Sequence, residues 1–109
     1  MNRKVIWVLV STTSKKEAEK IGRATIEQRL AACYGLYPKL KSVYFWPPKS
    51  DRLEESKGPL LVLETLPKHY ARITSTVKKM HSDQLPFIGK ITVDGIGKSF
   101  YNWMAREIH

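Results

Sequence analysis

Cys33 carries the most distinctive chemistry of this chain, because it is the only cysteine among the 109 residues. A thiolate sulfur is a soft ligand that favours Cu(I) or Zn(II) over hard cations. One cysteine cannot form an intrachain disulfide or complete a metal cage within one chain. A lone cysteine at the junction of a helix and a strand is also commonly a small buried apolar residue. A ligand role and structural burial therefore both stay open for Cys33.

The three histidines, His69, His81 and His109, lack the spacing that presents two imidazoles to one ion. The chain has neither an i, i+4 histidine pair nor a His-x-His sequence. His81 falls where a helix is expected to end, so its charged form would interact favourably with the helix dipole. Helix termination is one interpretation of His81, and a binding role is the other.

The sequence offers no pattern that is typical of catalysis. A nucleophile beside a base, or two carboxylates in differently tuned surroundings, would be needed. The hydroxyl residues 11–14 are explained by capping of a helix, although an anion can also bind at such a helix start. The glycine-rich stretch Gly95-Ile-Gly97-Lys98 lacks the spacing of a nucleotide-binding loop and indicates a turn. We therefore expect a binding protein and not an enzyme.

The first half of the chain reads as a strand, a helix and a second strand. Residues 5–10 are continuously apolar, which predicts a central strand buried on both faces. Ser14 and Glu17 form a capping-box pattern at a helix start. The apolar side of that helix is expected to be Ala18, Ile21, Gly22, Thr25 and Ile26. Residues 34–46 are rich in β-forming types and are interrupted at Pro38, which predicts a long, bent strand.

The second half continues with a loop, two more strands and two helices. The segment from Pro47 to Pro59 is expected to be a loop or a distorted hairpin tip, and residues 60–63 a third strand. A helix should follow Pro67 and end near His81, with an apolar side formed by Tyr70, Ile73, Val77 and Met80. Residues 87–88 and 91–93 predict a fourth strand. A short C-terminal helix carries one stripe of Phe100, Trp103, Met104 and Ile108.

This order of elements fits a single domain spanning residues 1–109. Two right-handed βαβ crossovers, joined through a central hairpin, give a four-stranded antiparallel sheet with both crossover helices on one face. We therefore predict the α+β class and a ferredoxin-like βαββαβ sandwich. A long hairpin joins its second and third strands, and the extra short helix follows at the C-terminus.

One face of this sheet has no helix to cover it. Tyr44, Phe45 and Trp46 follow one another in the second strand and so place aromatic side chains on both faces. Large exposed apolar surfaces usually mark an interface, so we expect these residues in a contact between identical chains. Stacking on RNA bases is the alternative, but the chain lacks the basic-glycine-aromatic signature of RNA-recognition modules.

The chain is strongly basic, with 19 Lys and Arg against 10 Asp and Glu and a formal net charge of +9. A positive field attracts nucleic acid, anionic lipid and phosphorylated ligands. The basic residues form no run longer than two, which favours a solvated surface over a nucleic-acid partner.

The apolar run at residues 5–10 is far shorter than the ~20 residues of a membrane-spanning helix, and no cleavage site follows it. A chain with one cysteine also suits a reducing compartment. We therefore expect a cytoplasmic protein without a membrane partner.

Many segments of the chain resemble the CutA family of divalent cation tolerance proteins, in the family's order and approximate spacing. These segments are Val8–Thr13, Glu17–Ile21, Glu27–Cys33, Ser42–Trp46, Leu60–Thr65, His81 with Pro86, and Tyr101–Trp103. The most specific of them is Arg29-Leu-Ala-Ala-Cys33, and the resemblance covers nearly the whole chain.

The resemblance implies a ferredoxin-like subunit in a tight homotrimer, with long hairpins that complete sheets across subunit boundaries, and a likeness to PII-type signalling proteins. It also implies a role in tolerance or sensing of copper and other divalent metal ions, through clefts between subunits. The candidate ligands are a divalent metal ion, copper among them, or a small anionic ligand. The alternative is a structural or adaptor trimer that holds no metal and presents Pro47, Pro48 and Leu53 to a protein partner.

The segment from His81 to Phe87 departs from the family, which usually has two carboxylates here. Asp83 can substitute for one of them, whereas Gln84 and Phe87 are poor cation ligands. Glu64 stands where the family usually has a lysine. The resemblance therefore leads us to predict Cys33, His81 and Asp83 as the metal ligands.

Overall fold

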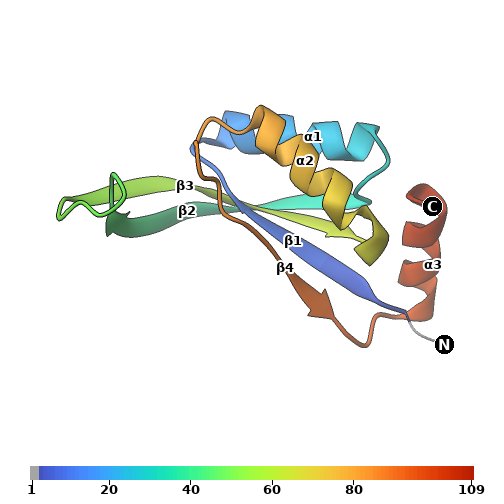
Figure 1. Ribbon diagram of the computed structural model, residues 1–109. Coiled ribbons are helices and arrows are strands. Elements are labelled where there is room, and N and C mark those ends of the chain that lie inside the picture. Colours follow the sequence, from blue (N-terminus) through green and yellow to red (C-terminus); the bar gives the residue numbers. More distant parts are fainter. Residues whose placement is uncertain (1–2) are drawn as a thin grey trace.

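A computed structural model describes residues 3–109, without the side chains of Lys39 and Leu40. The chain runs through four strands, three α-helices and one short 3-10 helix (Figure 1). In chain order these are β1 (Val5–Ser11), α1 (Lys15–Glu27), β2 (Cys33–Phe45), β3 (Leu53–Thr65), η1 (Pro67–His69), α2 (Tyr70–Met80), β4 (Ile88–Val93) and α3 (Lys98–Glu107).

The strands form one antiparallel sheet in the order β2-β3-β1-β4. Helices α1 and α2 lie side by side on one face of this sheet, and α3 lies at one of its ends (Figure 1). This order, with both crossover helices in one layer, confirms the predicted α+β class and ferredoxin-like arrangement.

The main core lies between the sheet and the two crossover helices. From β1, the residues Ile6, Val8 and Val10 point into it, because alternate residues of a strand face the same side. The predicted apolar sides of both helices are confirmed, since Ala18, Ile21, Ile73 and Val77 among others are fully buried there.

The other face of the sheet has no such cover among residues 3–109. Trp7 and Leu9 alternate with the core residues of β1 and are only half-buried. The prediction that the first strand is buried on both faces is therefore wrong for the single chain, although the strand is central as expected. We call this surface the open face; its residues include Trp7, Leu9, Cys33, Gly35, Tyr37, Leu60, Val62, Glu64 and Ile91.

A second, smaller core anchors α3. Met104 and Ile108 are buried against Val5 and Leu66, with Tyr101 packed beside them. The predicted stripe is partly wrong, because Phe100 and Trp103 are exposed and contact each other with ring centroids 5.4 Å apart. In their place, the half-buried Tyr101 packs against this second core.

Strands β2 and β3 continue far beyond the rest of the sheet as a two-stranded arm, residues 41–57 (Figure 1). The last pair between β1 and β3 joins Ser11 to Leu60, so residues 53–57 pair with β2 alone. The predicted loop is therefore too long: residues 53–59 belong to a strand, and only residues 46–52 connect the two. Cross-strand hydrogen bonding extends β3 despite its polar sequence. The bend predicted at Pro38 is confirmed by a register shift between Tyr37 and Leu40.

The arm leaves the sheet where Gly58 passes the end of β1. A Cβ atom on Gly58 would lie 1.9 Å from the carbonyl oxygen of Thr12, which is a severe overlap with backbone. The Pro59 carbonyl accepts hydrogen bonds from both the Thr12 N–H and the Thr12 hydroxyl, at 3.2 and 2.7 Å. These bonds hold the two backbones together, so only glycine fits at position 58.

We predict that Gly58→Ala lowers the free energy of unfolding by about 2–3 kcal/mol, because neither backbone can move without breaking the bonds at Pro59. Urea denaturation monitored by circular dichroism measures the change. The matched control is Gly97→Ala, whose added Cβ meets no atom within 4 Å. A loss no larger at Gly58 than at Gly97 would contradict this account of the crossing.

Candidate functional site

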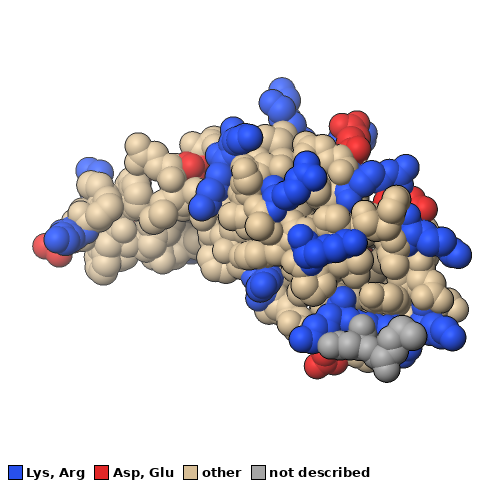
Figure 2. Space-filling view, turned by 45° about the vertical axis from the view of Figure 1, so that its right-hand side comes forward, with Lys and Arg blue, Asp and Glu red and all other residues tan. Residues whose placement is uncertain are grey.

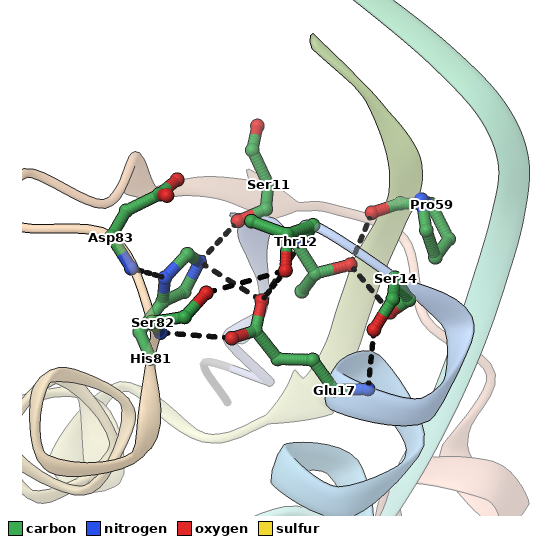
Figure 3. A network of polar contacts seen from close by, with 9 residues as sticks. Ser11, Thr12, Ser14, Glu17, Pro59, His81, Ser82 and Asp83 are labelled. Carbon is green, nitrogen blue, oxygen red and sulfur yellow. Dashed lines mark hydrogen bonds and ion pairs between the residues drawn. The ribbon is translucent and has the colours of Figure 1, made fainter.

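Two groups of polar side chains contain the candidate site residues that the sequence predicted. The first is a hydrogen-bonded cluster that joins the start of α1 to the end of α2, and Figure 3 shows it from close by. We call it the Glu17 network; its residues are Ser11, Thr13, Ser14, Glu17, His81, Ser82 and Asp83. The second group is the Cys33–Glu64 pair on the open face.

Glu17 is the centre of the first group. Its carboxylate accepts hydrogen bonds from the backbone N–H of Thr13 at 2.9 Å, from the Thr13 hydroxyl at 2.9 Å, and from the backbone N–H of Ser82 at 2.8 Å. Ser14 caps the helix as predicted, since its hydroxyl accepts from the Glu17 N–H. The other half of the predicted capping box is different, because the carboxylate binds Thr13 and Ser82 and not the N-cap residue itself.

These bonds determine the charge of Glu17. Partial burial of the carboxyl by itself raises its pKa, but the hydrogen bonds from Thr13 and Ser82 together outweigh burial and lower the pKa from 4.5 to about 2. Glu17 is therefore ionised throughout the neutral range. Its ionised carboxylate links the α1 N-terminus to the segment that follows α2.

His81 is held by bonds at both ring nitrogens. Nδ1 accepts from the Asp83 N–H at 3.0 Å, so the proton is on Nε2, which donates to the carbonyl oxygen of Ser11 at 2.5 Å. Nε2 also lies 3.8 Å from the Glu17 carboxylate. The side chain of His81 is fully buried. His81 ends α2 as predicted.

Asp83 takes part in this network through its backbone. Its N–H binds His81, while the residue itself is exposed. Its carboxylate points away from the imidazole and Glu17 (Figure 3). The structure therefore places His81 and Asp83 side by side, as the sequence order required, and leaves the Asp83 carboxylate accessible to solvent.

Cys33 lies at the start of β2 on the open face, directly opposite Glu64 of β3. The residue is exposed, so of the two interpretations of Cys33, structural burial does not hold for the single chain. Partial burial, together with the negative charge of Glu64 and a hydrogen bond to it, raises the pKa of the Cys33 thiol. Cys33 is therefore a protonated thiol at neutral pH in the free chain.

The Cys33–Glu64 pair borders a hollow of about 320 Å³ on the open face. Its remaining lining residues are Trp7, Gly35, Leu36, Tyr37 and Val62. Gly35 has no side chain and so leaves space between Cys33 and Tyr37. The hollow combines an apolar wall with one thiol and one carboxylate. Sequence reasoning identified Cys33 but missed the pairing, which depends on the register of β2 with β3.

Cys33 does not meet the other two predicted ligands, His81 and Asp83, within one chain. His81 contacts Ser11 at one end of β1, whereas Cys33 lies opposite Glu64, which pairs with Trp7 near the other end. Across the described residues, no three His, Cys, Asp or Glu side chains are arranged to hold a metal ion. A site that uses both Cys33 and His81 would need a second chain.

The aromatic residues that we predict in a subunit contact are on the arm. Tyr44 and Phe45 are exposed there, at 41% and 59%, and Trp46 is half-buried. Phe45 lies opposite Leu53, which is 61% exposed. The tip of the arm therefore presents apolar side chains to solvent in the single chain. None of the helices in residues 3–109 has the length and apolar character needed to cross a membrane.

We predict that Glu17→Gln destabilises the fold by about 1–3 kcal/mol at pH 7, because an amide cannot accept all three bonds that the carboxylate accepts. A depressed pKa in the folded state contributes stability that is present above the unfolded value of 4.5 and is lost as pH falls toward about 2. The difference between variant and parent should therefore shrink from pH 5 to pH 2 in urea titrations.

The matched control is Glu27→Gln, which removes the same charge from an exposed position of α1. We expect this variant to stay within about 0.5 kcal/mol of the parent at every pH. A Glu17→Gln penalty that does not change between pH 7 and pH 2 would contradict the assignment of the carboxylate as the stabilising form.

Comparison with known proteins adds evidence from the whole chain. Residues 6–107 match the family described as "CutA1 divalent ion tolerance protein". The divalent-cation tolerance protein CutA of Archaeoglobus fulgidus is 30% identical over 102 residues, which cover 94% of this chain and 96% of the relative. That of Thermus thermophilus is 28% identical over 100 residues, covering 92% and 94%.

The fold agrees with a solved structure as well. The structure of the periplasmic divalent cation tolerance protein CutA from Archaeoglobus fulgidus has a TM-score of 0.89 and 27% identity, and covers 96% of this chain and 99% of that one. That relative is called periplasmic, so the cytoplasmic location expected for this chain stays a prediction. The family match and the full-length similarity together establish that the chain belongs to the CutA1 divalent ion tolerance family.

Proposed function

We propose that this chain works as a homotrimer that binds a divalent metal ion, copper among the candidates, at surfaces created between its subunits. Its membership of the divalent ion tolerance family supports a role in metal tolerance. The observation that supports an assembly of several chains is the open face of the sheet. The proposal includes no catalytic step.

The open face leaves part of its apolar surface in water. Trp7 and Leu9 near its centre are half-buried, and Ile91 on the edge strand β4 is 48% exposed. Apolar area of this kind gains about 25 cal/mol per Å² when it leaves water. A second chain is the available cover, since both crossover helices lie on the other face.

The strand edges support the same conclusion. Residues 53–57 of the arm pair only with β2, and β4 pairs only with β1. Unpaired strand edges are templates for another strand, so the arm of one subunit is suited to extend the sheet of its neighbour. The number three comes from the resemblance to the family, and the geometry supplies the complementary edges and the apolar surface.

We predict a stable species of three times 12.6 kDa in solution, measured by light scattering coupled to size exclusion at micromolar concentration. Ile91→Glu should shift the mass toward the single chain, because an unpaired carboxylate would be buried in each contact. The matched control is Leu85→Glu, since Leu85 is 77% exposed in the loop before β4. A parent that runs as a monomer, or an Ile91→Glu variant with the parent's mass, would exclude this assembly.

For the metal we propose Cys33 as the principal ligand, with Glu64 beside it. The pair offers one sulfur and one oxygen donor, and an assembly that joins open faces would bring further copies toward it. Asp83 and His81 stay in the proposal as additional ligands. Asp83 is the stronger of the two, because its carboxylate is exposed, whereas both nitrogens of His81 are already engaged.

We predict that Cys33→Ala weakens Zn(II) binding at least tenfold in isothermal titration under reducing conditions. Because the pKa of the Cys33 thiol is raised, binding must displace its proton, so the affinity of the parent should increase between pH 6 and pH 8. Asp51→Asn on the exposed loop of the arm is the control. Equal affinity and stoichiometry in the parent and Cys33→Ala would remove Cys33 as a ligand.

An adaptor trimer without a metal is the second candidate. Pro47 and Pro48 are exposed in the loop of the arm, and Leu53 is exposed at the start of β3. The predicted loop position of Leu53 is thus corrected to a strand end, but its exposure suits contact with a protein. A parent that forms the trimer and shows no heat of binding with Zn(II) or Cu(I) would favour this candidate.

A further inference from the structure

The fold collects cations that are scattered along the sequence. Lys16, Lys20 and Arg23 are exposed on the outward side of α1, at helical spacing. η1 and α2 add further exposed cations, and both crossover helices lie in one layer (Figure 1). We call this surface the cationic face; it consists of Lys16, Lys20, Arg23, Lys68, Arg72, Lys78 and Lys79.

On α2, the charges of this face are not opposed by acids of the same segment. The sequence has no Asp or Glu between Glu64 and Asp83, a segment that includes the whole of α2. Over the described residues, none of the seven cations of the face forms an ion pair. On α1, Glu17 is already bound to Thr13 and Ser82, and Glu19 is half-buried. Glu27 is exposed four residues after Arg23, so α2 carries most of the unopposed charge. In Figure 2 blue side chains recur across the visible surface and red ones are few.

A shallow, open depression lies along α2 within this face. Its volume is about 450 Å³, and it is lined by Ala71, Thr74, Ser75, Lys78 and Lys79. Ala71 and Ser75 are small and exposed, so an extended partner can approach the helix closely. The Ser75 hydroxyl and the two ammonium groups are hydrogen-bond donors of the kind that contact phosphate oxygens. The Thr74 hydroxyl donates to Tyr70 and is therefore already occupied.

We propose that the cationic face docks the phosphate backbone of double-stranded nucleic acid without reading its sequence. Lysine-rich surfaces bind polyphosphates through summed, weak contacts that release counterions. The large exposed aromatic residues Tyr37, Tyr44, Phe45, Phe87, Phe100 and Trp103 all lie outside α1 and α2. The face thus offers no stacking platform for single strands and no apolar anchor for a membrane.

A folded protein partner fits the face less well, because lysine is depleted in protein interfaces and aromatic anchors are absent here. The absence of runs of basic residues counted against nucleic acid in the sequence. Helical spacing changes that conclusion, because residues four and seven apart share one side of a helix. The proposal depends neither on the metal ligands nor on the trimer.

The experiment measures fluorescence anisotropy of a labelled 20-base-pair DNA duplex of mixed sequence, titrated with the full-length protein at 50, 100 and 200 mM KCl. We expect micromolar dissociation constants that weaken with salt, with a logarithmic slope of about −3 to −6, since each neutralised phosphate contributes about −0.9. The variant Lys78→Glu with Lys79→Glu should bind at least tenfold more weakly at 50 mM KCl. The neutral pair Lys78→Gln with Lys79→Gln should fall between that variant and the parent.

The matched control is Lys57→Glu with Lys98→Glu. It changes the net charge by the same amount, but at exposed positions on the arm and at the start of α3. We expect its affinity to stay within about threefold of the parent at each salt concentration, and its circular dichroism to match that of the other variants. Equal losses in the two Glu variants would show binding by net charge alone and would overturn the proposal. It would also be overturned if no binding occurred at 50 mM KCl, if a single strand of equal length bound more tightly, or if polyglutamate of equal charge competed as well as duplex.

Discussion

Two helices can cover only one face of a four-stranded sheet, and this constraint shapes the whole molecule. In β1, Ile6, Val8 and Val10 turn toward the helices, so Trp7 and Leu9 must turn the other way. A strand with apolar residues on both sides needs two covers. The chain supplies one cover itself. In the assembly that we propose, a neighbouring chain supplies the second cover, and the exposed arm and the free edge of β4 lie on the same sheet.

The two sides of the sheet therefore have different chemistry. The helical layer carries exposed cations that interact favourably with water, whereas the open face carries tryptophan, aliphatic residues and the Cys33–Glu64 pair. Between them, the Glu17 network fixes how the helices sit on the sheet. Glu17 at the start of α1 accepts a hydrogen bond from Ser82, which follows α2. His81 links the same segment to the end of β1 through its hydrogen bond with Ser11. The polar groups that look most like a site from the sequence thus hold the helical layer in place.

Patterns with a short repeat were readable from the sequence, and contacts that depend on register were not. The helical spacing of Ile73 and Val77 leads directly to the observed core, whereas the continuous apolar run of β1 does not show which of its side chains face the helices. The length of β3 was underestimated, because residues 53–57 are polar and extended only by pairing with β2. The C-terminal helix was placed correctly. Helical spacing put Phe100 and Trp103 on one side with Met104, but in the structure these two aromatic residues are exposed and Met104 is buried. Tyr101 is instead the aromatic residue of this helix that packs, half-buried, against the cluster of Val5 and Leu66.

The candidate site follows the same division. Ser14 as helix cap and His81 as helix end were predictable, because caps are local features. The partners of Glu17 and His81 were not, because Ser82 and Ser11 are 65 and 70 residues away in sequence. The register that sets Cys33 opposite Glu64 likewise depends on a shift inside β2 that the sequence indicates only as an interruption at Pro38.

The tight crossing of Gly58 and Thr12 bears on how quickly subunits would join and part. A projecting hairpin that swings freely loses conformational entropy when a partner holds it. Here the hydrogen bonds to the Pro59 carbonyl set the direction of the arm before any encounter. Such preorganisation lowers the entropic cost of association. A subunit held in this way would dissociate slowly, because its release requires all of its contacts to break together.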